Sequence, residues 1–321
     1  MACMSAQDNA ISHLAPTSAG LRRRVVKGLL RTTMKPFLAA HPPVSLQRAW
    51  TKAFTQSIRK PRAVQHHSRQ FGAVPVHILQ PANGVPGEVV LFLHGGAYVL
   101  GGDGAYVGYA GQMAKALGRT IWLPEYRLAP EHAYPAAVED ALTAFDAIVD
   151  NGIAPERIIL MGDSAGGGLS LATALALRDR GGPQAGALVL MSPWTDLTMS
   201  GESVQRLARR DPFIPPTWGG HARIGYAGAR PFDDPGLSPL FAELNGLPRT
   251  LVQVGSEEIL LSDSIRLVEA ATQADVEIHC EVYDGLWHDF QMQVGLLPDA
   301  TRAVARIRRF MNGDDSHSPH R

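Results

Sequence analysis

A serine stands at the centre of a Gly-x-Ser-x-Gly pattern, GDSAG at residues 162–166. The apolar residues 158–161 before it predict a strand buried on both faces, and the Ala- and Leu-rich residues after it have helical spacing. Such a turn holds the serine hydroxyl at a helix N-terminus, where the helix dipole and free N–H groups favour negative charge. The pattern predicts a nucleophile at Ser164; the alternative is a serine that only caps the helix.

A second turn could supply hydrogen-bond donors for that chemistry. The sequence HGGAY at residues 94–98 directly follows an apolar run, and its glycines let the backbone approach a ligand closely. The N–H groups of Gly95 and Gly96, joined by that of Ala165, would stabilise the oxyanion of an acyl-transfer reaction. The alternatives are an ordinary glycine turn and a nucleotide-binding loop, although residues 94–104 lack the G-x-G-x-x-G spacing.

The same chemistry needs a base and an orienting acid. His288 lies in a predicted turn after the final strand, and in the hydrolase topology the histidine follows the serine and the acid along the chain. The acid must accept a hydrogen bond from the imidazole and hold its orientation. Glu258, in the segment GSEEILLSD at residues 255–263, is the preferred acid. The alternatives are other acids on neighbouring loops: Asp263, Glu257 and Asp196.

Strand and helix patterns alternate along the chain and predict an α/β fold with a doubly wound, mostly parallel sheet. The pattern at residues 73–79 includes a proline and predicts an edge strand. Further strands are expected at residues 88–93, 120–123, 158–161, 187–191, 250–254 and 276–282. Helices are expected at residues 106–117, 136–149, 264–272 and 300–311, and another begins near Leu169.

Two segments fall outside this alternation, and we expect them to form a helical cap. Residues 195–247 are rich in Gly and Pro turns and are too long for a simple connection. The predicted organisation is therefore a sequence of five parts: an N-terminal cap arm (1–65), a first part of the catalytic core (66–194), a cap insertion (195–247), a second part of the core (248–312) and a disordered tail (313–321).

The arm contains a basic amphipathic pattern at residues 21–38. Leu21, Val25, Leu29 and Leu30 fall on one helical face, and the arginines and the lysine lie largely elsewhere. We expect this helix to pack on the main domain with its charged face in water. The alternative is a helix that lies on a membrane or serves in targeting.

Composition limits the classes of partner and cofactor. Among 321 residues, Lys+Arg and Asp+Glu both number 30, so no overall field would attract nucleic acid or a membrane. Cys3 and Cys280 are too few for a disulfide framework, and no pattern predicts a metal or cofactor site. No apolar run reaches the length of a membrane-spanning helix, and the first residues do not resemble a signal peptide, so we expect a cytoplasmic protein without stable membrane insertion.

Four motifs together resemble one known family. They are HGGA at residues 94–97, EYRLAPEH at 125–132, GDSAGG at 162–167 and SPW at 192–194. From about residue 70 onward the chain resembles the bacterial hormone-sensitive-lipase-like carboxylesterases (family IV) of the α/β-hydrolase fold, in the branch with a GDSAG motif. Ala97 replaces the third glycine of the family's HGGG motif, and Glu258 stands where the family usually has an aspartate.

The resemblance implies a serine carboxylesterase that hydrolyses short- to medium-chain esters of small molecules through an acyl-enzyme on Ser164. It implies no cofactor, a cap built from the arm and the insertion, and a homodimer as one possible assembly. We expect Tyr98 and Trp194 to line the substrate pocket. The alternative functions are an amidase or a lactonase with the same triad, and a non-catalytic protein that binds small molecules on this fold.

Overall fold

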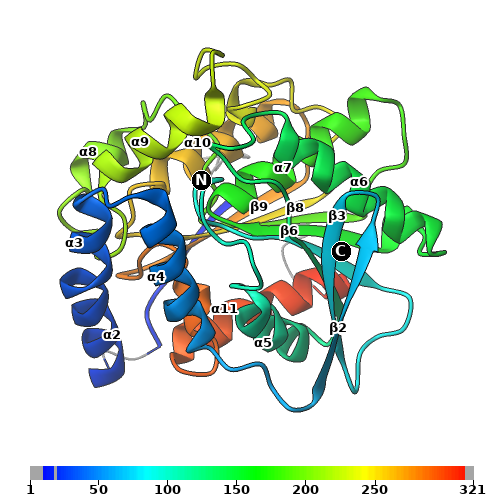
Figure 1. The fold of residues 1–321 in the computed structure, drawn as a ribbon, viewed down its shortest axis with the longest axis horizontal. Helices are drawn as coiled ribbons and strands as arrows, with labels where there is room; N and C mark the ends of the chain where they lie inside the picture. The colour runs from blue at the N-terminus through cyan, green and yellow to red at the C-terminus, as the bar shows by residue number, and fades with distance from the viewer. Residues whose placement is uncertain (1–9, 18–19, 315–321) are drawn as a thin grey trace, which may run out of the picture.

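The computed structural model of the chain describes residues 10–17 and 20–314, and a sheet runs through its middle (Figure 1). The strands within those residues are β1 (Ile11–Leu14), β2 (Val64–Phe71), β3 (Val74–Pro81), β4 (Val89–Leu93), β5 (Thr120–Pro124), β6 (Ile158–Asp163), β7 (Ala187–Met191), β8 (Thr250–Gly255) and β9 (Ile278–Tyr283). They lie in the order β1-β9-β8-β7-β6-β4-β5-β3-β2. β3 pairs antiparallel with β2 and β5, and the other neighbours pair parallel. The predicted α/β class is confirmed.

Helices cover both faces of this sheet (Figure 1). On one face lie α5 (Val107–Leu117) and α11 (Pro298–Asn312); on the other lie α6 (Ala136–Asp150), α7 (Ala165–Asp179) and α10 (Leu261–Gln273). Side chains alternate between the two faces of a strand, so β4 contributes to two cores. Leu91 and Leu93 belong to the core that α7 completes, and Val90 and Phe92 to the core that α5 completes.

Five further helices come from the N-terminal arm and the insertion. They are α2 (Leu21–Thr32), α3 (Met34–Ala39) and α4 (Val44–Gln56) from the arm, and α8 (Glu202–Arg206) and α9 (Pro216–Ala227) from the insertion. The two groups contact each other: α3 packs on α9, and Trp218 of α9 donates a hydrogen bond to Gln47 of α4. These contacts suit the predicted cap. The division of the chain into five parts stays a prediction, and most of the tail lies outside the described residues.

The amphipathic pattern of the arm does not pack as expected. The chain bends at Thr33, so that the pattern forms two helices instead of one. On α2 only Leu30 is buried, whereas Leu21, Val25 and Leu29 are exposed. Leu30 therefore does not share the face of the other three, as the pattern had suggested. The expectation of an apolar face packed on the main domain is therefore wrong for most of α2. Within the described ranges, no helix combines the length and the apolar character needed to cross a bilayer.

The sequence patterns missed the strands at the two edges of the sheet. β1 has four residues and pairs parallel with β9, and β2 is largely polar and exposed and pairs antiparallel with β3. β3 was expected at the edge because of its proline, but β2 lies outside it. A short strand and a polar strand give weak periodic signals, and both features protect an edge from pairing with other chains.

Candidate active site

Ser164 lies in the sharp turn between β6 and α7, with φ 53° and ψ −122°. A residue with a side chain rarely adopts such a conformation, and the surroundings must hold it in place. Glycines on both sides make this turn possible. A Cβ atom at Gly162 would lie 2.2 Å from the carbonyl oxygen of Gly166, and one at Gly166 would lie 1.9 Å from the carbonyl oxygen of Leu93. Ser164 lines a cavity, and its hydroxyl has no hydrogen-bond partner among the described residues.

His288 follows β9 and lies buried beside Glu258, which follows β8. Nδ1 of His288 lies 3.2 Å from Oε1 of Glu258. Oε2 of Glu258 accepts hydrogen bonds from the Ser192 hydroxyl at 2.9 Å and from the Gly255 N–H at 2.8 Å. Burial raises the pKa of Glu258, and the hydrogen bond with His288 opposes this change. The structure thus brings Glu258 to the position that an orienting acid needs.

The other candidate acids have different partners. Oδ2 of Asp263 accepts two backbone N–H groups at 2.9 and 3.0 Å, and burial raises the pKa of Asp263 to about 7. Glu257 pairs with Lys27 on α2, and Asp196 pairs with Arg266 at 2.6 Å. None of these three carboxylates contacts the imidazole of His288.

Asp289, which no sequence pattern indicated, contacts the opposite side of the imidazole. Its Oδ2 lies 3.1 Å from Nε2 of His288, and its Oδ1 is buried without a hydrogen-bond partner among the described residues. Burial alone would lower the pKa of His288, but the carboxylates of Asp289 and Glu258 outweigh burial and hold this pKa well above its ordinary value. The two carboxylates therefore favour the protonated imidazole, and Oδ2 of Asp289 lies beside the Nε2 atom that a catalytic base would use.

The predicted set of oxyanion donors needs a correction. The N–H of Gly95 donates to Oδ1 of Asp163 at 3.1 Å, so it already has a partner. The N–H groups of Gly96, Ala97 and Ala165 have none among the described residues. Gly96 has a φ of 118°, a region that favours glycine. The geometry therefore leaves Gly96, Ala97 and Ala165 free to donate, and replaces Gly95 by Ala97.

Asp163 connects the turn at Ser164 with the glycine turn after β4. Besides the Gly95 N–H, it accepts a hydrogen bond from the hydroxyl of Tyr106 at 3.1 Å. Burial, and then the nearby charge of Asp289, raise the pKa of Asp163 well above its ordinary value. His94 precedes this turn, stacks on Tyr126 at 4.2 Å between ring centroids, and has a pKa lowered by burial. The contacts of Asp163 and His94 thus pack against the glycine turn.

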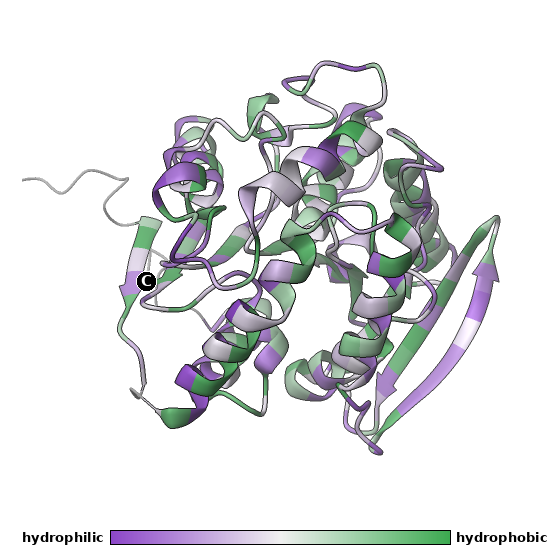
Figure 2. Cartoon of the chain, turned by 60° about the vertical axis from the view of Figure 1, so that its left-hand side comes forward, coloured by the Kyte–Doolittle hydropathy of each residue, from purple (hydrophilic) through white to green (hydrophobic). Residues whose placement is uncertain are grey.

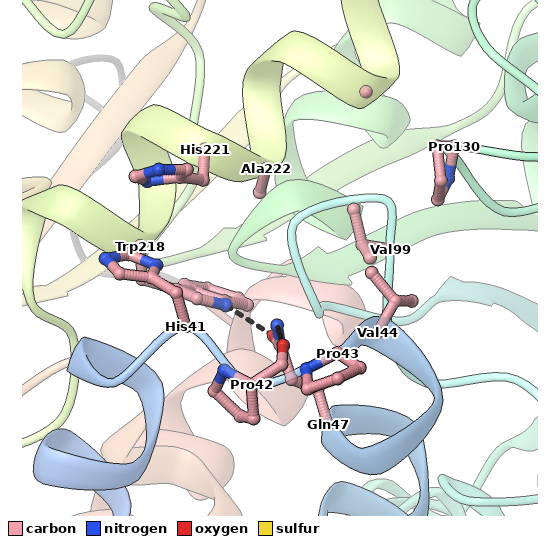
Figure 3. A pocket seen from close by; sticks show the side chains of 11 residues that line it. His41, Pro42, Pro43, Val44, Gln47, Val99, Pro130, Trp218, His221 and Ala222 are labelled. Carbon is pink, nitrogen blue, oxygen red and sulfur yellow. Dashed lines mark hydrogen bonds between the residues drawn. The ribbon is translucent and has the colours of Figure 1, made fainter.

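Trp218 of α9 lines two cavities. The inner cavity, of about 50 Å³, is lined by Ser164 and His288 and by apolar side chains of the arm and the insertion, including Met34, Leu38, Phe54 and Phe213. The outer cavity, of about 280 Å³, lies between the start of α4, α9 and the loops at Val99 and Pro130 (Figure 3). The indole Nε1–H of Trp218 donates to Oε1 of Gln47 at 2.8 Å (Figure 3). Trp218 thus forms a wall shared by both cavities.

Tyr98 and Trp194, expected to line the pocket, line neither cavity. The ring of Tyr98 stacks on Tyr226 with 3.6 Å between centroids and 1° between planes. The indole N–H of Trp194 donates to the carbonyl oxygen of Asp196 at 3.1 Å. Both side chains are almost fully buried and belong to the hydrophobic core. In this structure the two aromatic residues expected in the pocket thus pack within the core.

Comparison with known proteins relates this geometry to a family. A family model described as the α/β hydrolase fold matches residues 90–292. An esterase of Acinetobacter venetianus is 39% identical over 235 residues, which cover 71% of this chain and 76% of that protein. An acetyl-hydrolase of Streptomyces hygroscopicus is 38% identical over 226 residues, which cover 70% of this chain and 75% of that protein.

Solved structures agree with these matches. The crystal structure of an esterase from the bacterial hormone-sensitive lipase family matches with a TM-score of 0.87 and 34% identity, over 92% of this chain and 99% of that one. The chain belongs to this family of α/β-hydrolases. The esterase EstE5, in a crystal soaked with p-nitrophenyl butyrate, matches with a TM-score of 0.85 and 31% identity over the same shares of both chains. The resemblance inferred from four motifs is confirmed.

Residues that the motifs did not reveal complete the site of this α/β-hydrolase. Asp289 directly follows His288, and Ser192 belongs to the SPW motif, but neither was expected to contact the triad. Phe213 and Trp218, which line the inner cavity, lie in a short amphipathic stretch of the insertion, DPFIPPTWGG at residues 211–220, that pointed to no particular role. In the part of the chain that the structure describes, no group of three His, Cys, Asp or Glu side chains could hold a metal ion.

Glu258→Ala should lower kcat by on the order of 10⁴-fold, because His288 would lose the carboxylate that orients Nδ1. Asp263→Ala should lower the melting temperature and leave kcat of the folded protein nearly unchanged. Asp263 accepts hydrogen bonds from buried N–H groups and does not contact the imidazole. Steady-state hydrolysis of p-nitrophenyl butyrate, with thermal unfolding as the control for folding, separates the two effects. A folded Asp263→Ala variant with the larger loss of kcat would contradict the assignment of Glu258.

Asp289→Asn should move the acid limb of the kcat/KM profile to lower pH by at least about one unit. The base must be neutral to accept a proton, and the Asp289 carboxylate raises the pKa of His288, so its removal makes the neutral imidazole available at lower pH. The other carboxylates that interact with His288 remain in the variant; they belong to Glu258, Asp163 and Asp211.

The matched control is Asp284→Asn, on the same loop, where the carboxylate lies 3.6 Å from Nδ1 of His13. This variant should keep the wild-type acid limb. An unchanged limb in folded Asp289→Asn would show that the contact does not control the protonation of His288.

Proposed function

We propose that this chain is a serine carboxylesterase that hydrolyses short- to medium-chain esters through an acyl-enzyme on Ser164. One observation carries the proposal: the strained Ser164 turn, the His288–Glu258 pair and three free backbone N–H groups converge near the inner cavity. Curated relatives named as esterases and acetyl-hydrolases support the same activity.

The proposed reaction begins from the neutral form of His288, with Nε2 turned to the Ser164 hydroxyl. In structures without substrate, such catalytic contacts are often long and tighten on binding. Nε2 then takes the hydroxyl proton while Oγ attacks the ester carbonyl. His288 returns that proton to the departing alcohol, and an acyl-enzyme remains. Water repeats both steps and releases the carboxylic acid.

The proposed oxyanion donors are the N–H groups of Gly96, Ala97 and Ala165. The amide of Ala165 lies at the N-terminus of α7, where the helix dipole adds to its effect. Backbone donors cannot be removed by side-chain substitution, and each donor of this kind contributes about 3 to 4 kcal/mol to transition-state stabilisation. The proposed role of Asp163 is to hold Gly95, so that the next two amides face the reacting carbonyl.

The inner cavity supports the short-chain part of the proposal. At about 50 Å³ it would accept a short acyl group, and we infer that Trp218, which lines both cavities, forms the wall between them. Methylene groups beyond that wall would have to displace the indole or leave by another direction. Amidase and lactonase activities, and a non-catalytic binding role, stay alternatives that no further contact favours. A cytoplasmic location and a homodimer stay predictions.

Ser164→Ala should abolish hydrolysis of p-nitrophenyl butyrate and leave the fold intact, because the hydroxyl supplies the attacking oxygen and makes no hydrogen bond among the described residues. Turnover and circular dichroism measure the two parts of this expectation. In the wild type, an organophosphate should add its mass to the peptide that contains Ser164. Unchanged turnover in the variant, or a label on a different peptide, would rule out the proposed mechanism.

Trp218→Ala should raise the kcat/KM ratio of p-nitrophenyl octanoate to butyrate by about tenfold, because loss of the wall joins the two cavities. Trp218→Phe is the matched control: it also loses the hydrogen bond to Gln47 but keeps a large ring, so its ratio should stay near the wild-type value. Equal ratios in all three proteins would mean that long acyl chains do not pass Trp218.

A further inference from the structure

The apolar stripe of α2 faces solvent. Leu21, Val25 and Leu29 lie on successive turns of one helical face, and their exposed fractions are 74%, 59% and 55%. Leu30, the buried residue of α2, points to the opposite side. An amphipathic helix of a globular protein normally turns its apolar stripe to the core. Here the described residues leave that stripe uncovered.

Exposed apolar side chains concentrate in this arm. Of the nine large exposed apolar side chains in the described part of the chain, five lie between residues 21 and 50. The other two of the five are Leu46 and Trp50 on α4, and the ring of Trp50 stacks on Phe37 of α3 at 4.9 Å. Figure 2, which brings this side forward, shows green and purple stretches along the arm helices. Single exposed apolar residues are ordinary, but a concentration marks an interaction surface.

Basic side chains flank the stripe on both sides. The α2 sequence LRRRVVKGLLRT carries four arginines, one lysine and no acid. At about 100° per residue, Arg22 lies along one side of the stripe, and Arg24 and Arg31 lie along the other. All three are exposed, and none forms an ion pair with an acidic group among the described residues. An apolar stripe between two basic margins is the pattern of a helix that lies in a membrane interface.

The neighbouring insertion extends the basic surface. The guanidinium of Arg31 donates to the carbonyl oxygens of Arg209 and Arg210 at 3.1 and 3.2 Å, which brings two more exposed arginines beside α2. The carboxylate of Glu257 meets α2, but Lys27 already pairs with it. The whole chain has equal numbers of acidic and basic residues, so this excess of positive charge is a local feature.

Charge selects the partner that fits this surface. A second copy of the chain would bring its own arginines against these, and like charges repel. Anionic lipid headgroups would attract the arginines, and the headgroup–acyl boundary would take up the leucines and the valine. We propose that α2, with the flanking arginines, docks this protein on an anionic bilayer surface, where the helix lies in the plane of the interface and does not cross it.

This surface and the candidate active site share the arm. α3 follows α2 after Thr33, and its Met34 and Leu38 line the inner cavity with Ser164. Phe54 of α4 lines the same cavity. Docking would therefore place the cavity-lining arm next to the lipid. The inference goes beyond the proposed function, because binding to lipid requires no turnover.

The test is cosedimentation of the full chain with vesicles. The protein should bind vesicles of phosphatidylcholine with phosphatidylglycerol, should bind vesicles of pure phosphatidylcholine far less, and should be released as salt rises. The double variant Val25→Asp/Leu29→Asp should bind the anionic vesicles at least about tenfold more weakly. Arg22→Gln/Arg24→Gln should also bind more weakly and with a smaller dependence on salt.

Val85→Asp/Leu296→Asp is the matched control, because it makes the same kind of change at exposed positions outside the arm, and it should bind like the wild type. Hydrolysis of a soluble short-chain ester should be equal in the control and in both arm variants, which shows that they are folded. No binding to anionic vesicles at low salt would overturn the proposal. Binding of Val25→Asp/Leu29→Asp equal to that of the wild type would overturn it too. So would a wild-type protein that does not bind vesicles but forms a dimer, if the double variant is a monomer.

Discussion

Close contact between two turns is the constraint on which the rest of the site depends. The start of α7 lies so near the end of β4 that a single methyl group at Gly166 would meet the Leu93 carbonyl oxygen at 1.9 Å. This contact brings together the turns of Ser164 and Gly96, which line the same cavity. It also explains why Ser164 keeps a conformation that an isolated turn would avoid. The sheet supplies the rigidity, because β4 and β6 are neighbouring parallel strands.

Around this contact the protein buries several ionisable side chains. His288 is enclosed by Glu258 on one side and Asp289 on the other, and Asp163 and Asp211 lie near enough to interact with them. Carboxylates removed from water favour their neutral form, and a positive charge on the imidazole would stabilise their charged form. The pKa of His288 therefore depends on the carboxylates around it.

The alternation of strand and helix patterns let the sequence predict the α/β class. Glycine spacing and the order of candidates along the chain indicated Ser164, His288 and Glu258. Other features of the site depend on where a side chain points, which the residue type alone does not determine. Tyr98 has a φ of 64°, and its ring lies against Tyr226 in the core instead of in the pocket. Asp289 has a φ of 53°, and its carboxylate lies at Nε2 of His288. The partner of the Gly95 amide, Asp163, lies 68 residues away, so only the packing of two turns reveals it.

The two unpredicted edge strands have a mechanical consequence. β1 forms one edge of the sheet and β2 forms the opposite edge. The arm helices α2, α3 and α4 therefore lie between two segments that are both fixed in the sheet. Unlike a terminal segment that is attached at one end, this arm is anchored by strand pairing at both ends. Met34, Leu38 and Phe54 of these helices line the cavity at Ser164, so a shift of the arm would change that cavity. Deletion of the arm together with β1 would therefore remove an edge strand from the sheet as well as the side chains that line the cavity.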